Sequence, residues 1–198
     1  MVVVCLDLEG VLVPEIWIEV SRKTGIKDLS LTTRDIPDYD VLMRRRIEIL
    51  RRHRVRLKDI QRVISSMSPL PGAKSFLSQL RRQRQVVILS DTFYEFAMPL
   101  MKKLGYPTLF CNRLEVDSRG FIAGYDLRQK NGKEKAVKAL QSIGFRVHAA
   151  GDSYNDLTML KASDRAVFFN PPDKIRKEFP KFKTVRQYAD LMTALLHS

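Results

Sequence analysis

The most constraining feature of the sequence is an alternation of strand-like and helical segments that begins after residue 72. Short apolar runs, typical of buried strands, alternate with segments whose apolar residues recur at helical spacing. The strand-like runs fall at 85–89, 146–150 and 166–169, and the helical segments at 73–82, 94–104, 133–143 and 155–161. This alternation predicts an α/β fold in which helices flank a mostly parallel sheet.

A first strand and a helical insertion precede the alternating part. The apolar run 2–8 predicts a fully buried parallel strand. Apolar spacing then becomes helical, with one helix ending at Gly25 and two more over 41–50 and 57–64. Pro69-Leu70-Pro71-Gly72 closes this region. We therefore expect a core formed by residues 1–14 and 69–198, with a small helical cap, residues 15–68, inserted after the first strand.

The remaining pattern within the core predicts a hairpin. Two short strand-like runs between residues 113 and 126 flank Asp117-Ser118-Arg119-Gly120, whose composition is that of a turn.

The chain is strongly basic, with 35 Lys and Arg against 22 Asp and Glu and a formal net charge of +13. Arginine clusters occur at 44–46, 51–54 and 81–84. One explanation is a nucleic-acid-binding surface, and the other is solvated helix faces on a protein that handles anionic substrates. Because no aromatic residues are interleaved with the clusters, we favour the second explanation.

Composition also restricts the compartment. The sequence contains no run of about 18 apolar residues, so no membrane span is predicted. The apolar N-terminal run lacks the basic start of a signal peptide. Cys5 and Cys111 are too few for a disulfide framework. We expect a cytoplasmic protein, and we assign no chemistry to the three unclustered histidines, His53, His148 and His197.

Three predicted strands end in reactive polar residues. These ends are Asp7-Leu8-Glu9, Ser90-Asp91-Thr92 and Gly151-Asp152-Ser153-Tyr154-Asn155-Asp156. Each alone is compatible with a helix cap or a turn. Ligands of open α/β sheets bind beyond the carboxyl ends of the strands, so three such ends at one edge indicate an active site.

These residue types suit phosphoryl transfer. The carboxylate of Asp7 can attack phosphorus and form an acyl phosphate, and Glu9 can donate and accept protons. The attacking anion and the phosphate repel each other, so we expect Mg²⁺, held by Asp7 and Asp152 and by a backbone carbonyl just after Asp7. Ser90 and Lys133 can donate to the phosphoryl oxygens.

In this order and spacing, the residues resemble the four motifs of the haloacid-dehalogenase-like (HAD) phosphohydrolases. The motifs are Asp7-x-Glu9-Gly10-Val11, Ser90-Asp91-Thr92, Lys133 and Gly151-Asp152-x-x-Asn155-Asp156. The helical insertion resembles the cap of the phosphoserine phosphatase branch. Longer segments, such as 5–15, 32–43, 88–96 and 149–156, resemble its subgroup that also transfers phosphate to homoserine. The resemblance implies a HAD-like Rossmannoid sheet, L-phosphoserine and homoserine as substrates, and a role in serine and threonine biosynthesis. A homodimer is compatible with it.

The resemblance also implies a role for each matching residue. Asp7 would be the nucleophile and a Mg²⁺ ligand, and Glu9 the general acid and base, binding Mg²⁺ through its backbone carbonyl. Asp152 would be the third protein ligand, with Asp156 orienting metal-bound water. Four further roles concern substrate: Ser90 and Lys133 would hold the phosphoryl group, and Glu15 and Arg46 the amino and carboxylate groups. Asp91 and Asn155 complete the expected substrate-binding set.

Several alternatives remain open at this stage. Lys130 and Lys135 compete with Lys133, the basic run around Arg46 can be a solvated face, and Glu15 can simply favour a helix N-terminus. Most of the superfamily has Asp at the position of Glu9, which leaves the choice between water and homoserine as acceptor unsettled. The rival functions are a HAD phosphatase for another small phosphoester, such as a sugar phosphate or nucleotide, and a nucleic-acid-binding protein on this scaffold.

Overall fold

The computed structural model of the protein describes residues 1–32, 35–36 and 38–196. Thr33, Arg34 and Pro37, which fall in the resembling segment 32–43, and His197 lie outside these residues. The helices are α1 (Ile16–Thr24), α2 (Tyr39–Arg52), α3 (Leu57–Ser66), α4 (Ala73–Arg81), α5 (Tyr94–Lys103), α6 (Gly132–Ser142), α7 (Leu157–Ala162), α8 (Asp173–Glu178) and α9 (Tyr188–Leu196), with 3₁₀ helices η1 (Lys27–Ser30) and η2 (Tyr154–Asp156). The strands are β1 (Val2–Leu6), β2 (Gln85–Phe93), β3 (Thr108–Val116), β4 (Ile122–Asp126), β5 (Arg146–Gly151), β6 (Arg165–Phe169) and β7 (Lys183–Val185).

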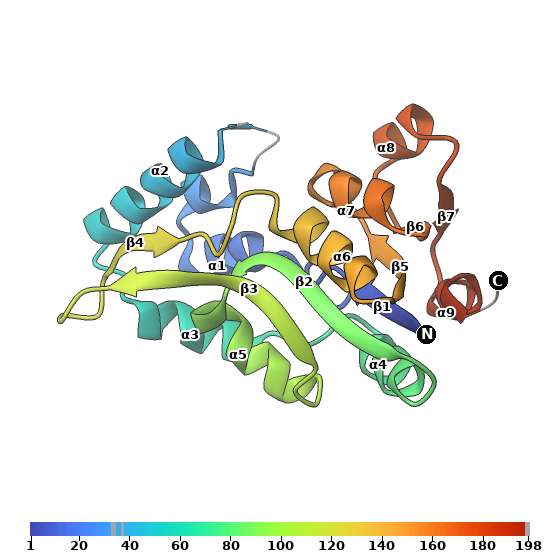
Figure 1. The fold of residues 1–198 in the computed structure, drawn as a ribbon. Coiled ribbons are helices and arrows are strands. Elements are labelled where there is room, and N and C mark those ends of the chain that lie inside the picture. The colour runs from blue at the N-terminus through green and yellow to red at the C-terminus, as the bar shows by residue number, and fades with distance from the viewer. Residues whose placement is uncertain (33–34, 37, 197–198) are drawn as a thin grey trace.

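The strands form one sheet in the order β4-β3-β2-β1-β5-β6-β7 (Figure 1). Every neighbouring pair is parallel except β3 and β4, which form the predicted antiparallel hairpin. The expected α/β sheet flanked by helices is confirmed. Because β1 lies between β2 and β5, the carboxyl ends of these three strands are neighbours.

Alternate residues of the central strands enter two apolar cores, one on each face of the sheet. Val4 and Leu6 of β1 belong to the core that is also formed by α4, α5 and α9. Val3 and Cys5 belong to the core on the other face, with α6, α7 and α8. Burial on both faces explains why the strands read as continuous apolar runs in the sequence.

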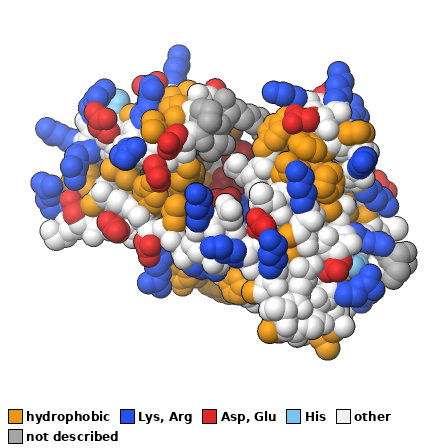
Figure 2. Space-filling view, turned by 45° about the horizontal axis from the view of Figure 1, so that its top comes forward, with side chains coloured by type: hydrophobic (Ala, Val, Ile, Leu, Met, Phe, Trp, Pro, Cys, Tyr) orange, Lys and Arg blue, Asp and Glu red, His pale blue; other side chains and the backbone are white. Residues whose placement is uncertain are grey.

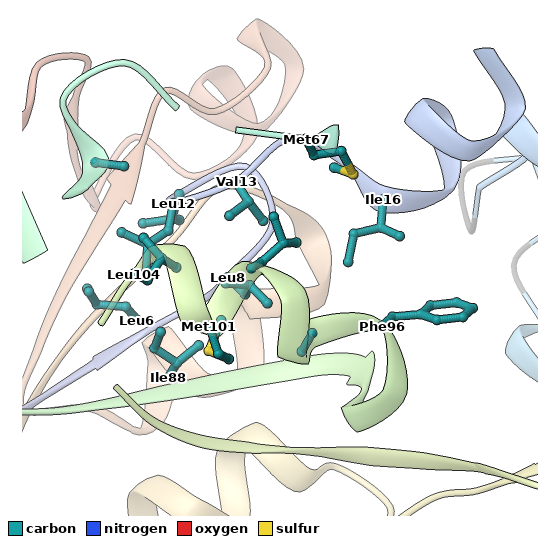
Figure 3. Close-up of a cluster of buried hydrophobic side chains, with 14 of the residues drawn as sticks. Leu6, Leu8, Leu12, Val13, Ile16, Met67, Ile88, Phe96, Met101 and Leu104 are labelled. Atoms are coloured by element: carbon teal, nitrogen blue, oxygen red, sulfur yellow. The ribbon is translucent and has the colours of Figure 1, made fainter. Parts of the chain in front are cut away.

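The chain turns sooner after β1 than the apolar pattern predicts. The predicted strand 2–8 is wrong at its end, because β1 stops at Leu6 and the Leu8 carbonyl accepts hydrogen bonds from the amides of Leu12 and Val13. Gly10 within this turn has φ of 73°, a conformation that favours glycine. Figure 3 shows Leu8, Leu12 and Val13 among the apolar side chains that anchor the turn to the core.

Other element boundaries also differ from those that the apolar periodicity predicts. Strand β2 continues to Phe93 rather than stopping at 89, and β3 begins at Thr108 rather than near 113. The predicted helix 155–161 is split into η2 and α7. The elements after residue 170, α8, β7 and α9, had no counterpart in the sequence-based expectation. None of the described helices is long and apolar enough to cross a membrane.

The helices between β1 and α4 lie against the hairpin and α5. The Tyr125 hydroxyl of β4 donates a hydrogen bond to the Asp40 carboxylate of α2, and the Leu57 amide of α3 donates to the Gly120 carbonyl of the hairpin turn. The Gln61 side chain of α3 donates to the Glu95 carbonyl of α5 at 2.9 Å. Figure 1 shows β4 beside α2. The division into a core and a cap at residues 15–68 stays a prediction.

Three basic side chains bind the last carbonyls of α9. Arg165 donates to the Ala194 carbonyl at 3.2 Å, the His148 Nδ1 to Leu195 at 2.7 Å and Arg84 to Leu196 at 3.3 Å. Donors at a helix C-terminus satisfy carbonyls that have no partner within the helix. Burial lowers the pKa of the His148 imidazole, and neighbouring arginines act in the same direction. The His148 imidazole is therefore neutral at neutral pH when it donates its hydrogen bond to the end of α9.

We expect this histidine to make folding sensitive to acid. Because its pKa is lowered in the folded state, protonation favours the unfolded chain, and its contribution is lost as pH falls below its ordinary value of 6.5. The His148→Gln variant keeps a donor for the Leu195 carbonyl but cannot titrate. Urea unfolding at pH 7.5 and 5.5 should show a larger loss of stability in the wild type than in the variant. Equal losses in both proteins would contradict this role.

Candidate active site

The nine residues predicted to bind substrate, bind metal or act in catalysis all line one cleft of about 430 Å³. They are Asp7, Glu9, Glu15, Arg46, Ser90, Asp91, Lys133, Asp152 and Asn155. Figure 2 looks into the hollow between the two lobes, with acidic side chains at its bottom. The residues come from segments up to about 150 positions apart, brought together because the carboxyl ends of β1, β2 and β5 are neighbours.

A buried lysine lies at the centre of the site. The Lys133 ammonium is 2.9 Å from Asp7 Oδ1, 2.8 Å from Asp156 Oδ1 and 3.4 Å from Asp91 Oδ2. Lys133 is buried near the start of α6, whereas its competitors Lys130 and Lys135 are exposed. Of the three candidates, Lys133 is the one that the fold directs into the cleft.

Within this network the pKa values of Lys133 and Asp7 are both raised above their ordinary values. Burial alone would lower the pKa of the Lys133 ammonium, but Asp156, Asp7 and Asp91 outweigh it and hold that pKa well above its usual value. Burial and the neighbouring Asp156 raise the pKa of Asp7, an effect that Lys133 opposes. A cation added beside Asp7 would stabilise its charged form.

Asp156 is fully buried and serves as a brace. One oxygen contacts Lys133, and the other accepts hydrogen bonds from the backbone amides of Asp152 at 2.9 Å and Ser153 at 3.1 Å. The chain passes so closely here that a Cβ on Gly151 would lie 2.3 Å from the Asp156 Cγ. Asp156 thereby fixes the loop that carries Asp152.

Three carboxylates form a candidate cation site. Oxygens of Asp7, Asp152 and Asp156 lie within 4.8 Å of one another. Both Asp156 oxygens already accept hydrogen bonds from Lys133 and from backbone amides, so Asp156 is poorly available as a direct ligand. Asp152 also packs against Gly10, where a Cβ would lie 2.3 Å from its carboxylate carbon. This oxygen donor set fits a hard divalent cation.

Glu9 connects the turn after β1 to the start of α1. Its carboxylate accepts a 2.7 Å hydrogen bond from the Ile16 amide at the start of α1. Burial, with Glu15 nearby, raises the pKa of Glu9 to about 8, so the side chain carries a proton at neutral pH in this environment. A protonated carboxyl group beside a leaving oxygen is a suitable general acid.

Arg46 of α2 is buried in the wall of the cleft, with 6% of its surface exposed. Its guanidinium stacks 4.4 Å from the centre of the Trp17 ring, and one terminal nitrogen donates to the Leu31 carbonyl at 2.7 Å. Its Nε has no hydrogen-bond partner within the described part of the chain. Glu15 is the N-cap residue of α1, but its side chain makes no capping hydrogen bond. The burial of Arg46 argues against a solvated face, whereas the substrate role of Glu15, and its alternative as a charge that favours the start of α1, stay predictions.

The remaining predicted residues differ in exposure. Ser90 is buried and its hydroxyl accepts a 3.2 Å hydrogen bond from the Thr92 amide. The Asp91 side chain is 48% exposed, and Asn155 is exposed at the rim.

Sequence reasoning missed several residues of the cleft. Trp17 was not assigned to the site, yet its ring lines the cleft and supports Arg46. The Tyr39 ring lines the cleft beside Tyr125, at a ring separation of 5.9 Å. Asn170, with φ of 47°, follows β6 and adds a fourth strand end to the rim. The Asn170-Pro171-Pro172 turn after an apolar strand was the one signal that could have revealed it.

Comparisons with known proteins identify the family of the chain. Residues 1–164 match the family model for haloacid dehalogenase-like hydrolases. The chain is 55% identical over 196 residues to the phosphoserine phosphatase ThrH of Pseudomonas aeruginosa, covering 99% of this chain and 96% of the relative. It is also 55% identical over 189 residues to a phosphoserine phosphatase of Pseudomonas syringae pv. tomato, covering 96% and 80% of the two chains.

Solved structures show the same fold. A phospho-aspartyl intermediate analogue of phosphoserine phosphatase superposes with a TM-score of 0.77 at 19% identity, covering 96% of this chain and 97% of the other. A substrate-bound phosphoserine phosphatase complex gives 0.72 at 18% identity, covering 94% and 93%. The family model covers most of the chain, and the expected family is confirmed: the chain belongs to the haloacid dehalogenase-like hydrolases.

Proposed function

We propose that this protein is a Mg²⁺-dependent phosphoserine phosphatase that forms an aspartyl phosphate on Asp7 and also transfers the phosphoryl group to homoserine. The observation that carries the proposal is the pairing of two features in one cleft. Asp7 is buried and held by Lys133, and Arg46 is a buried cation on the cap side. The near-full-length relatives named phosphoserine phosphatase support the same substrate.

Asp7 and Asp152, with the Glu9 backbone carbonyl, would hold Mg²⁺, and Asp156 would orient its water ligands. The bound ion supplies the positive charge that lets a carboxylate approach a phosphate. The residues present fit this role because they offer hard oxygen donors beside a fixed lysine.

The first half-reaction begins at Asp7. Its Oδ1 is held by Lys133, while no hydrogen bond or ion pair among the described residues engages Oδ2. Oδ2 attacks phosphorus, the bond from phosphorus to the serine oxygen breaks, and Glu9 gives its proton to the departing oxygen. Lys133 and the Ser90 hydroxyl stabilise the charge on the phosphoryl oxygens.

The second half-reaction regenerates Asp7. Glu9, now a carboxylate, removes a proton from the incoming nucleophile, whose oxygen attacks phosphorus and displaces the Asp7 oxygen. Water as nucleophile yields inorganic phosphate, and the homoserine hydroxyl yields phosphohomoserine. The resemblance to the phosphotransferase subgroup, which shares Glu at this position, supports the second acceptor.

The cap side of the cleft supports an amino-acid substrate rather than a sugar phosphate or nucleotide. A buried guanidinium favours a carboxylate, with which it forms charge-assisted hydrogen bonds. Glu15 and Asp91, two carboxylates of the same cleft, suit the ammonium of the substrate. We further propose a cytoplasmic enzyme of serine and threonine biosynthesis, and homodimerisation stays a prediction.

Replacing Asp7 by Asn tests the nucleophile. The amide cannot form the acyl phosphate, so phosphate release from phosphoserine in the presence of Mg²⁺ should fall by at least about 10³-fold. Assays with labelled phosphoserine and added homoserine should lose both labelled phosphate and labelled phosphohomoserine. An Asp7→Asn protein with full activity would refute the mechanism.

Replacing Lys133 by Met should harm both stability and activity. Removing the ammonium leaves Asp7 and Asp156 buried without their cation, and breaking such a pair costs about 3–5 kcal/mol. Urea unfolding measures the loss. Lys135→Met, two positions away and exposed, is the matched control and should change stability by less than about 0.5 kcal/mol. Similar effects of the two changes would argue against the network.

Replacing Arg46 by Ala tests substrate recognition. Losing a charge-assisted contact to the substrate carboxylate should lower kcat/KM for phosphoserine about 10–100-fold, mainly through KM. Arg45→Ala removes an exposed arginine from the adjacent position and should leave kinetics unchanged. For a substrate without a carboxylate, such as phosphoethanolamine, Arg46→Ala should change kcat/KM little. If Arg46→Ala lowered kcat/KM equally for both substrates, Arg46 would not be the group that binds the substrate carboxylate.

A further inference from the structure

A second concave site lies at the opposite end of the sheet from the catalytic cleft. Its volume is about 820 Å³, within the range of small-molecule pockets. It is lined by the start of β1, the loop between α4 and β2, and the first residue of β3. Figure 1 shows this end of the sheet beside the N-terminus and the end of α4, away from α1 and α2.

The charge of this hollow is entirely positive. Arg81, Arg82 and Arg84 line it, and none of its lining residues is acidic. Within the part of the chain that the structure describes, these arginines form no ion pair with a carboxylate, although other surface arginines such as Arg22 and Arg52 do. Three guanidinium groups therefore line one hollow with no carboxylate to offset their charge, and an anion bound there would be attracted to all three.

Two of the three arginines are held in place by backbone carbonyls. Arg81 donates to the Gly105 carbonyl at 2.9 Å, and Arg84 donates to the carbonyls of Gln83 at 2.8 Å and Leu196 at 3.3 Å. Carbonyl partners fix the side chains without cancelling their charge. An anion would therefore meet partly preorganised donors, which lowers the entropic cost of binding.

The other lining residues suggest the kind of anion. Gln83, Gln85 and Thr108 offer neutral hydrogen-bonding groups, and Val86 and Val87 offer a small apolar surface. Guanidinium groups match phosphate oxygens in geometry and charge, and three of them suit a ligand with several negative charges.

We propose that this hollow binds a small anion that carries a chain of phosphates, either as inorganic polyphosphate or as a nucleoside polyphosphate. Binding would occur at the amino ends of β1 and β2, the strands whose other ends lead to Asp7 and carry Ser90. The proposal is independent of the substrate of the catalytic cleft.

Calorimetric titration of the metal-free protein with inorganic tripolyphosphate tests the site. EDTA keeps the acidic catalytic cleft without its cation, which disfavours binding of the probe there. We expect one saturable site, weakened about tenfold or more by Arg81→Gln combined with Arg82→Gln. Arg51→Gln combined with Arg52→Gln removes the same charge from exposed positions on α2 and should leave the affinity unchanged.

Further arms keep the test decisive. Because Arg81 also braces the Gly105 carbonyl, Arg82→Glu provides a single change at an exposed side chain and should also weaken binding. Tighter binding of ATP than of tripolyphosphate would identify a nucleoside polyphosphate as the ligand, and equal or weaker binding would identify the inorganic chain. Absence of saturable binding, equal losses in the two double variants, or loss on Arg46→Ala would overturn the proposal.

Discussion

The ion pair between Lys133 and Asp7, shared with Asp156, is the interaction on which the rest of the site depends. An isolated charge in such a buried position would be strongly unfavourable, so each member requires the others. The network joins α6 to the carboxyl ends of β1 and β5. Asp156 also fixes the loop that carries Asp152, because it accepts hydrogen bonds from two backbone amides of that loop. The strand order of the sheet, and the close contacts at Gly10 and Gly151, make that geometry available.

The turn after β1 extends this constraint to α1 and α2. Asp7 contacts Lys133, and Glu9, two residues later, accepts a hydrogen bond from the first amide of α1. Helix α1 carries Trp17, whose ring supports the buried guanidinium of Arg46. One short segment thus fixes the proposed nucleophile Asp7, the proposed proton donor Glu9 and the start of the helix whose Trp17 supports Arg46. Any change in its backbone path would disturb all three.

Sequence alone predicted the parts of this arrangement that depend on local patterns. Strand ends that carry Asp7, Ser90 and Asp152 follow from apolar periodicity and from the rule that such ends meet at one edge of a parallel sheet. The resemblance to a family added Glu15 and Arg46. No spacing rule would have selected Glu15, or Arg46 from its run of three arginines.

What the sequence could not predict depends on contacts between distant segments. The support of Arg46 by Trp17, the place of Tyr39 beside Tyr125, and the clamp on the end of α9 each join residues from separate elements. The extension of β2 to Phe93 likewise depends on its pairing with β3, because Ser90-Asp91-Thr92 reads locally as a turn. These features arise from tertiary packing, which local propensity does not encode.

The distribution of charge reconciles a basic protein with an acidic active site. The chain has a net charge of +13, yet its cleft contains Asp7, Glu9, Glu15, Asp91 and Asp152 against only Lys133 and Arg46 among the described cations that line it. The two charge patterns act over different distances. At physiological ionic strength the screening length is about 8 Å, so the basic surface attracts an anionic substrate mainly as it approaches the protein. Within the cleft, contact interactions dominate, and there the carboxylates suit a divalent cation and an ammonium group rather than a phosphate alone. A phosphorylated amino acid satisfies both charge patterns. Its net negative charge is attracted by the basic surface, and its separate ammonium, carboxylate and phosphate groups match the charged groups and the cation site of the cleft.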